Sequence, residues 1–256
     1  MVAEKRCAVV YLARKVDGMR WMPRFLASLK AHPSGQTYDL IVILKGHADG
    51  ELPACLRGFR APGLGQKLTM AFDDTGFATE AFFAAAERFD HEAFLFFVSS
   101  ARVLAPDWAS KVFQPLLDGR AMLVGASSGL ESLDSTTPYP NPSIRTTGFA
   151  MRRVDWLALN RGDLSIRYGG NLFEAGPQSM TKQVLRQGGG VLLVGRDGQT
   201  FPPEAWQLSA TFRLSRQENL LFADNRTDQF DLARPAKRRR LVAVNWGEGV
   251  PMLPVP

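Results

Sequence analysis

The feature that most constrains the fold is an apolar run that ends abruptly in polar residues. Residues 93–98 (AFLFFV) are six apolar residues in a row, and Ser99, Ser100 and Arg102 follow closely. A short apolar run bounded by polar residues is typical of a strand buried on both faces of a parallel or mixed sheet. Ligands of open α/β sheets lie beyond the carboxyl ends of such strands. We therefore expect Ser99, Ser100 and Arg102 at a binding site.

The length and charge of the chain indicate one large domain with anionic partners. The chain has 256 residues, of which 45% are apolar and 22% charged, values that are ordinary for a globular protein. A net charge of +6 favours nucleotide phosphates, anionic lipid or nucleic acid as partners. Four consecutive cations at 237–240 (KRRR) supply much of this charge. We predict a single domain over residues 1–234, followed by a basic, proline-containing tail at 235–256.

Several common kinds of site are disfavoured because their motifs are absent. Cys7 and Cys55 have neither a CxxC partner nor a nearby histidine, which argues against a zinc site and favours reduced thiols. The sequence has no GxGxxG after its first strand and no GxxxxGK[ST], so a dehydrogenase and a P-loop enzyme are disfavoured. No stretch is long enough for a membrane span or a signal peptide, and we therefore expect a cytoplasmic protein.

The order of the expected elements indicates a Rossmann-like α/β sheet over the first half of the chain. Short apolar runs alternate there with amphipathic helical patterns. Strands are expected at 7–12, 38–44, 68–72, 93–98 and 121–126, and helices at 21–30, 77–89 and 106–117. Later elements are expected at 146–152 (strand), 179–187 (helix) and 191–194 (strand), with mostly irregular chain beyond 198. The predicted fold is therefore a mixed sheet flanked by helices in a single α/β domain.

Four segments share their order and spacing with one known family. They are the strand at 7–14 followed by FLASL at 25–29, DTGFA at 74–78 with its alanine-rich helix, the strand at 93–98 with PDW at 106–108, and TGFAMRR at 147–153 followed by FE at 173–174. Through these segments, residues 6 to about 200 resemble the nucleotide-sugar glycosyltransferases of the GT-A fold, closest to family 2. The resemblance implies transfer of a sugar from a nucleoside-diphosphate sugar to an acceptor hydroxyl, in glycan or surface-polysaccharide assembly.

The chain departs from this family at the metal-binding motif. The family places Asp-x-Asp at the end of the opening strand, where the carboxylates hold a divalent cation that neutralises the diphosphate leaving group. Residues 99–102 read SSAR here, and no carboxylate follows until Asp107. Two outcomes stay open. Either Arg102, with Lys45 or Arg145, neutralises the diphosphate in place of Mn²⁺ or Mg²⁺, or the protein is an inactive relative that binds a sugar or a partner.

The resemblance also implies roles for further residues. Glu174 falls at the family's glutamate and is the candidate catalytic base, although Ala175 stands where the family usually has its aspartate; the alternative for Glu174 is a first-turn helix carboxylate. Asp74 is a candidate acceptor for a ribose hydroxyl, with helix capping as the alternative. The other candidates are Tyr11, Ala13, Arg14, Lys45, Ser99, Ser100 and Arg102 for the nucleotide sugar, and Arg145 and Trp206 for the acceptor or phosphate.

The expected partners are a nucleotide-sugar donor and a glycan or lipid-linked acceptor. The basic run at 237–240 has three interpretations: a solvated tail, a contact for anionic lipid at the membrane surface, or a nucleic-acid contact. The last is disfavoured because the sequence shows neither an RNP-type aromatic motif nor a helix-turn-helix pattern. No cofactor is assigned, and a divalent cation stays an open question. An α/β nucleotide-binding protein without transferase activity is a third functional hypothesis.

Overall fold

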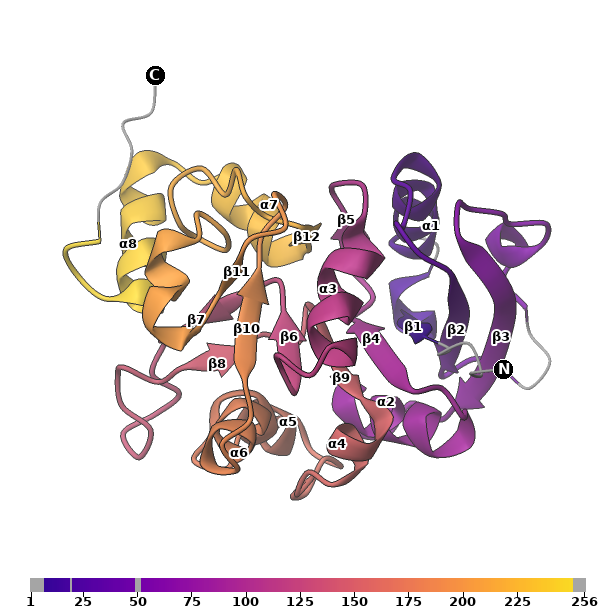
Figure 1. Cartoon of the computed structure of the whole chain (residues 1–256), viewed down its shortest axis with the longest axis horizontal. Helices are drawn as coiled ribbons and strands as arrows, with labels where there is room; N and C mark the ends of the chain where they lie inside the picture. Colours follow the sequence, from indigo (N-terminus) through magenta and orange to yellow (C-terminus); the bar gives the residue numbers. More distant parts are fainter. Residues whose placement is uncertain (1–6, 19, 49–51, 251–256) are drawn as a thin grey trace.

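The fold is built on one long mixed sheet. The computed structural model describes residues 7–18, 20–48 and 52–250, and in these ranges the main sheet has eight strands in the order β11-β10-β6-β9-β4-β1-β2-β3 (Figure 1). Its strands are β1 (Cys7–Arg14), β2 (Tyr38–Lys45), β3 (Leu64–Phe72), β4 (Ala93–Phe97), β6 (Leu123–Gly125), β9 (Gly148–Arg152), β10 (Val191–Val194) and β11 (Thr200–Phe201). Neighbouring strands are parallel except around β9 and at β11, which pair antiparallel.

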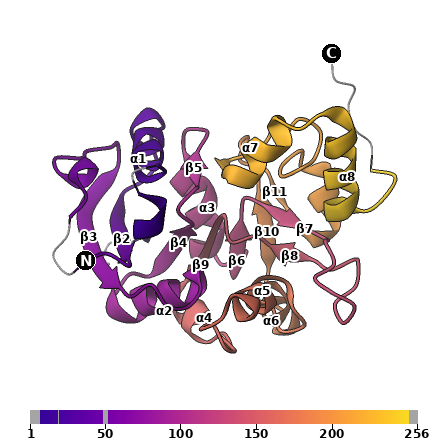
Figure 2. The same ribbon diagram turned by 180° about the vertical axis from the view of Figure 1, so that it is seen from behind.

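Helices cover both faces of this sheet. One face carries α1 (Met22–Ala31) and α3 (Trp108–Leu117), and the other carries α2 (Ala78–Arg88), α4 (Arg153–Leu157), α5 (Arg167–Ala175) and α6 (Met180–Arg186) (Figures 1 and 2). Along β1, Cys7, Val9 and Tyr11 pack into the first layer, whereas the alternate residues of the strand pack into the second. Burial on both faces explains why the central strands are continuous apolar runs.

The predicted fold class is confirmed. The chain has an α/β architecture with a mixed sheet flanked by helices, consistent with a GT-A, Rossmann-like fold. The strand expected at 93–98 is β4, and the helix expected at 77–89 is α2. Phe77 occupies the N-cap position of α2 and no side chain caps this helix, so the alternative interpretation of Asp74 as a helix cap is wrong.

The expectation of mostly irregular chain beyond residue 198 is wrong in part. This region contains β11, a 3₁₀ helix (Pro203–Leu208), β12 (Phe222–Ala223), α7 (Asn225–Asp231) and α8 (Pro235–Trp246). The basic run lies on α8, which ends in a fully buried Trp246 whose indole nitrogen donates to the Phe212 carbonyl at 2.8 Å. The start of the predicted tail is therefore an ordered helix, while residues 251–256 lie outside the described part. The domain boundary at 234 stays a prediction.

Two separate two-stranded sheets accompany the main one. β12 pairs antiparallel with β5 (Arg102–Val103), and β7 (Ser128–Gly129) pairs antiparallel with β8 (Ser143–Ile144). Cys7 and Cys55 do not form a disulfide. In the described ranges, none of the helices combines the length and the apolar composition that a bilayer crossing requires.

Candidate functional site

A cavity of about 490 Å³ opens at the carboxyl ends of β1, β2 and β4. Its charged and polar lining residues are Arg14, Lys45, Asp74, Ser99 and Arg167, and Phe77 at the start of α2 adds an apolar wall. Arg14, Lys45, Asp74 and Ser99 are residues that the sequence singled out. The structure therefore brings these four together at the edge of the sheet where α/β proteins bind ligands.

Lys45 holds one wall of this cavity in place. Its side chain is only 3% exposed, and its ammonium donates to the carbonyls of Asp73, at 3.0 Å, and Thr75. The same nitrogen lies 3.7 Å from the Asp74 carboxylate, which is 45% exposed. Asp73 also accepts two hydrogen bonds from Thr75, which lower the pKa of the Asp73 carboxyl. Lys45 thus orders the loop that presents Asp74 to the cavity.

Tyr11 supports the opposite wall from within the core. Its hydroxyl donates to the Ser99 carbonyl at 2.6 Å, and its ring stacks on Phe25 with 4.1 Å between centroids. The Ser99 hydroxyl donates to Asp17 at 2.7 Å. Tyr11 and Ala13 also line a small adjoining cavity beside Arg14 and Ser99. Tyr11 therefore positions Ser99 instead of facing the main cavity.

We expect replacement of Tyr11 by phenylalanine to flatten the alkaline stability profile. Burial, reinforced by the charge of Asp17, raises the pKa of Tyr11 above its ordinary value of 10.0. A tyrosine whose pKa is raised in the folded state stabilises that state fully below pH 10. As the pH rises above 10 this stabilisation is lost, by about 1.4 kcal/mol per pH unit. Tyr11→Phe should cost about 1 kcal/mol at pH 7, through the lost hydrogen bond, and reduce the slope above pH 10 in urea unfolding.

Tyr38→Phe is the matched control for this measurement. Burial also raises the pKa of Tyr38, but its hydroxyl has no hydrogen-bond partner within the described chain. Its replacement should therefore reduce the alkaline slope without the loss at pH 7. If the free energy of unfolding of Tyr11→Phe fell as steeply above pH 10 as that of the unmodified protein, Tyr11 would not be a buried, neutral phenol.

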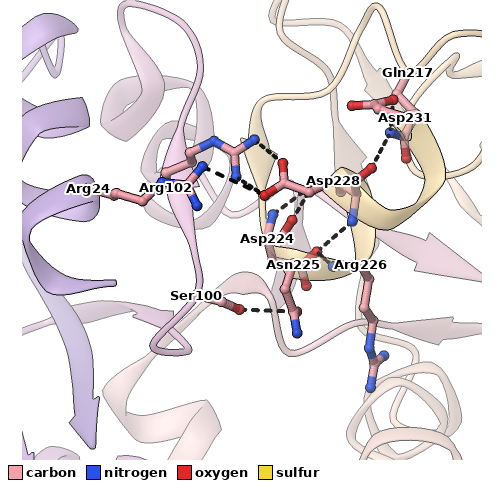
Figure 3. Close-up of polar contacts among 10 residues, drawn as sticks. Arg24, Ser100, Arg102, Gln217, Asp224, Asn225, Arg226, Asp228 and Asp231 are labelled. Atoms are coloured by element: carbon pink, nitrogen blue, oxygen red, sulfur yellow. Dashed lines mark hydrogen bonds and ion pairs between the residues drawn. The ribbon is translucent and has the colours of Figure 1, made fainter. Parts of the chain in front are cut away.

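Ser100 and Arg102 contact the C-terminal part of the chain and do not line the cavity (Figure 3). The Arg102 guanidinium binds both carboxylate oxygens of Asp228, at 2.5 and 3.2 Å, and Arg24 lies 3.7 Å from the same carboxylate. The Ser100 hydroxyl donates to Asn225 at 3.2 Å. These contacts tie β5 and the end of β4 to α7. A role for Arg102 or Ser100 in binding the nucleotide sugar stays a prediction.

Glu174 and Arg145 lie together near the start of β9, outside the lining of the cavity. Glu174 accepts hydrogen bonds from the Thr146 amide, at 3.0 Å, and from the Thr146 hydroxyl. Its other oxygen is 3.7 Å from Arg145, which also pairs with Glu131. Glu174 stands in the last turn of α5, so its interpretation as a first-turn carboxylate is wrong. Its role as catalytic base is a prediction that the geometry does not test.

Trp206 does not lie on a ligand-facing surface, and this expectation is corrected. Its side chain is fully buried, and its indole nitrogen donates to the Phe201 carbonyl at 3.1 Å. A ring enclosed by the core has no free face for a sugar. Trp206 is a core residue because the chain beyond 198 folds back onto the sheet.

The residues at this edge do not fit the divalent cation that the resemblance implies. Mg²⁺ and Mn²⁺ prefer several oxygen ligands, chiefly carboxylates. Asp74 is the one carboxylate among the described lining residues, and it shares the cavity with Arg14, Lys45 and Arg167. The part of the chain that the structure describes contains no group of three or more His, Cys, Asp or Glu side chains arranged to hold a metal ion.

Arg167 is the charged lining residue that the sequence did not reveal. It falls between the strand expected at 146–152 and the helix expected at 179–187, and α5 begins there. Gly169 and Gly170 weaken the helical pattern, yet the second is needed for packing, because a Cβ there would lie 2.0 Å from the ring of Phe77. Arg167 and Glu174 are seven residues apart, a spacing that places both on one helix face, and this was the available signal.

Comparisons with known proteins leave the family open. No family model matches the chain, and no curated protein is significantly similar to it. Among solved structures, the chain is similar to the galactosyltransferase LgtC in complex with donor and acceptor sugar analogs, with 12% identity and a TM-score of 0.46. The similarity covers 69% of this chain and 70% of that one. At this TM-score it carries no argument about the function of the present chain.

Proposed function

We propose that the protein binds a nucleoside-diphosphate sugar in the 490 Å³ cavity and transfers the sugar to an acceptor hydroxyl. The observation that carries the proposal is the set of three cations, Arg14, Lys45 and Arg167, that line the cavity from three different elements. A diphosphate leaving group gains negative charge during transfer, and fixed cations that stabilise this charge accelerate the reaction. Guanidinium groups suit this task because their planar forks bind phosphate oxygens in pairs.

The start of α2 adds to this anion-binding character. Residues 76–78 line the cavity, and no side chain caps the helix. The first amides of a helix lack intrahelical partners and favour a negative group. Phe77 and Leu12 supply apolar surface for a nucleoside, while the exposed Asp74 carboxylate can accept a ribose hydroxyl. In this arrangement the cations would bind the diphosphate and Asp74 the ribose.

The setting we propose is glycan or surface-polysaccharide assembly on a glycan or lipid-linked acceptor, as the sequence resemblance implies. Helix α8 supports a contact with anionic lipid at a membrane surface, because Lys237, Arg239 and Arg240 are exposed on it. Leu232, just before this helix, is 86% exposed. Exposed cations beside an apolar side chain are suited to an anionic lipid surface.

A second candidate is a protein that binds the nucleotide sugar without transferring it. The position of Glu174 favours this candidate, because one carboxylate oxygen is held by Thr146 and the other faces Arg145. A general base must be within hydrogen-bond reach of the acceptor hydroxyl. Glu174 would have to give up a present contact to act as that base.

Calorimetric titration with UDP, GDP and their sugars, with and without Mn²⁺, tests the proposal. We expect at least one nucleotide to bind with an affinity that Mn²⁺ changes by less than about threefold. Arg14→Gln and Arg167→Gln should each weaken that binding about tenfold, or about 1.4 kcal/mol. Arg57→Gln removes the same charge from an exposed residue outside the cavity lining and should have no effect.

The outcomes separate the candidates. If neither nucleotide nor any nucleotide sugar binds, both candidates are wrong. If a nucleotide sugar binds but is neither transferred nor hydrolysed, the non-catalytic candidate holds. Turnover that is unchanged in Glu174→Gln would remove Glu174 as the base.

A further inference from the structure

Two buried arginines meet at one aromatic ring in the C-terminal part of the chain. The guanidinium carbons of Arg213 and Arg145 lie 4.8 and 5.3 Å from the centre of the Phe212 ring. Arg213 is 8% exposed and Arg145 is 9% exposed. Placing two positive charges so close in a buried region costs free energy unless each charge has a partner.

Only one of these arginines has such partners. Arg145 pairs with Glu131, donates to Asn245 at 2.7 Å and lies 3.7 Å from Glu174. The Arg213 guanidinium forms no ion pair and no hydrogen bond with the rest of the described chain. The Nε–H groups of both arginines are buried without an acceptor in these described residues. Burial and the nearby charge of Arg145 lower the pKa of Arg213 to about 10.

The backbone around Arg213 is held in a costly conformation. Ala210, Arg213, Ser215 and Gln217 all have positive φ, between 49° and 56°. For non-glycine residues this conformation is unfavourable, because Cβ approaches the following carbonyl oxygen. The Gln217 side chain fixes the segment, because it accepts from the Arg213 amide at 2.9 Å and donates to Asp231 at 2.9 Å. Strain that persists in this way is characteristic of a functional segment.

The cluster formed by Arg145, Phe212 and Arg213 lies at the same edge of the sheet as the cavity. Asp224, whose charge acts on Arg213, accepts from the Thr147 hydroxyl at 2.8 Å. Thr147 precedes Gly148, which pairs with Phe97 at the carboxyl end of β4. Asp224 is itself occupied, since its other oxygen accepts the amides that begin α7.

An exposed third arginine stands at the outer side of the cluster. The charge of Arg226 acts on Arg213, and its side chain extends away from the Arg102–Asp228 pair (Figure 3). This guanidinium has no partner side chain in the part of the chain that is described. It can therefore reach a ligand that approaches from solvent.

We infer that Arg213, with Arg145 and Arg226, forms a subsite for an oxyanion, a phosphate or a carboxylate, carried by the acceptor. The two buried Nε–H donors and the Arg213 guanidinium, which forms no ion pair in the described chain, are the groups that such an anion satisfies. That the anion belongs to an acceptor rests on the proposed function. Binding of the anion itself does not, because none of the three arginines lines the nucleotide cavity.

Titration of sugar anions onto the UDP-saturated protein tests this subsite at constant ionic strength. The probes are glucose 6-phosphate, glucuronate and neutral glucose. We expect at least one anionic sugar to bind ten or more times tighter than glucose, and the stronger of the two identifies the anion as phosphate or carboxylate. Arg213→Gln should abolish this difference, Arg226→Gln should reduce it about threefold, and Arg57→Gln should leave it unchanged.

Two further measurements keep the result decisive. The favoured sugar anion should raise the unfolding temperature of the unmodified protein and of Arg213→Lys, which keeps the charge, but not that of Arg213→Gln. Equal binding of charged and neutral sugars, or an anion preference that survives in Arg213→Gln, would overturn the subsite. If Arg213→Gln does not fold, Arg226→Gln decides: a reduction of the anion preference of about threefold supports the subsite, and an unchanged preference overturns it. Repeating the titration without UDP separates the two proposals, because anion binding that depends on Arg213 can persist when UDP does not bind.

Discussion

Replacing Lys45 with methionine is expected to lower the free energy of unfolding by about 2–4 kcal/mol and to weaken nucleotide binding at least tenfold. Methionine fills similar space but donates no hydrogen bond. The carbonyls of Asp73 and Thr75 would both lose a charged donor, and Asp74 would lose its neighbouring cation. Because this loop forms a wall of the cavity, the loss of stability and the loss of affinity have the same origin. Urea unfolding and calorimetry with UDP measure the two effects.

Lys67→Met is the matched control. Lys67 lies on β3, outside the lining of the cavity, and its ammonium donates to the Leu56 carbonyl at 3.0 Å. Its replacement should cost about 1 kcal/mol, the usual contribution of one hydrogen bond, and leave UDP affinity unchanged. If Lys45→Met kept full stability and lost only affinity, Lys45 would act on the ligand alone and would not support the 73–75 loop.

The central sheet was predictable because its strands are specified locally. The runs at 7–12, 38–44 and 93–98 are apolar at every position except Asp39, and this pattern indicates burial on both faces. The structure buries them in this way between two helical layers. Arg14, Lys45 and Ser99 follow from the same rule, since the ends of parallel strands meet at one edge. Local pattern was therefore sufficient for the fold class and for one side of the cavity.

The partners of the other candidates were not predictable, because they come from distant parts of the chain. Arg102 follows the strand expected at 93–98 and begins β5, but Asp228, which engages it, is 126 residues away. Glu174 is held by Thr146, 28 residues earlier. The sequence places a charge at an element's end but does not say whether another element will neutralise it. Such pairing decides whether a charged side chain is available to a ligand.

The C-terminal region was underestimated because its elements are short or weakly patterned. Helix α8 contains four consecutive cations and lacks an apolar stripe, although Trp246 at its end is fully buried. Trp206 is enclosed by the same folding back of the chain. A single large aromatic can anchor a segment that binary patterning assigns to solvent.

Replacing Trp156 with alanine is expected to cost about 3–5 kcal/mol of stability and to weaken nucleotide binding about threefold or more. The indole is fully buried, stacks on Phe83 of α2 at 4.1 Å between centroids and meets Phe173 of α5 edge-on at 5.6 Å. It also packs on Phe96 of β4 at 4.9 Å. This ring is therefore the contact that holds α5, and with it Arg167, against the sheet.

Trp156→Phe separates packing from the loss of the indole N–H. That N–H has no hydrogen-bond partner within the described residues, so phenylalanine gives up volume but no hydrogen bond. Its cost should stay at about 1–2 kcal/mol, and UDP affinity should stay within about twofold of the original value. The affinities are compared by calorimetry under conditions where urea unfolding shows each variant to be folded. A Trp156→Ala variant that is folded and destabilised but keeps its UDP affinity would show that α5 stays in place without the aromatic cluster. The position of Arg167 would then depend on the close approach of Gly170 to Phe77.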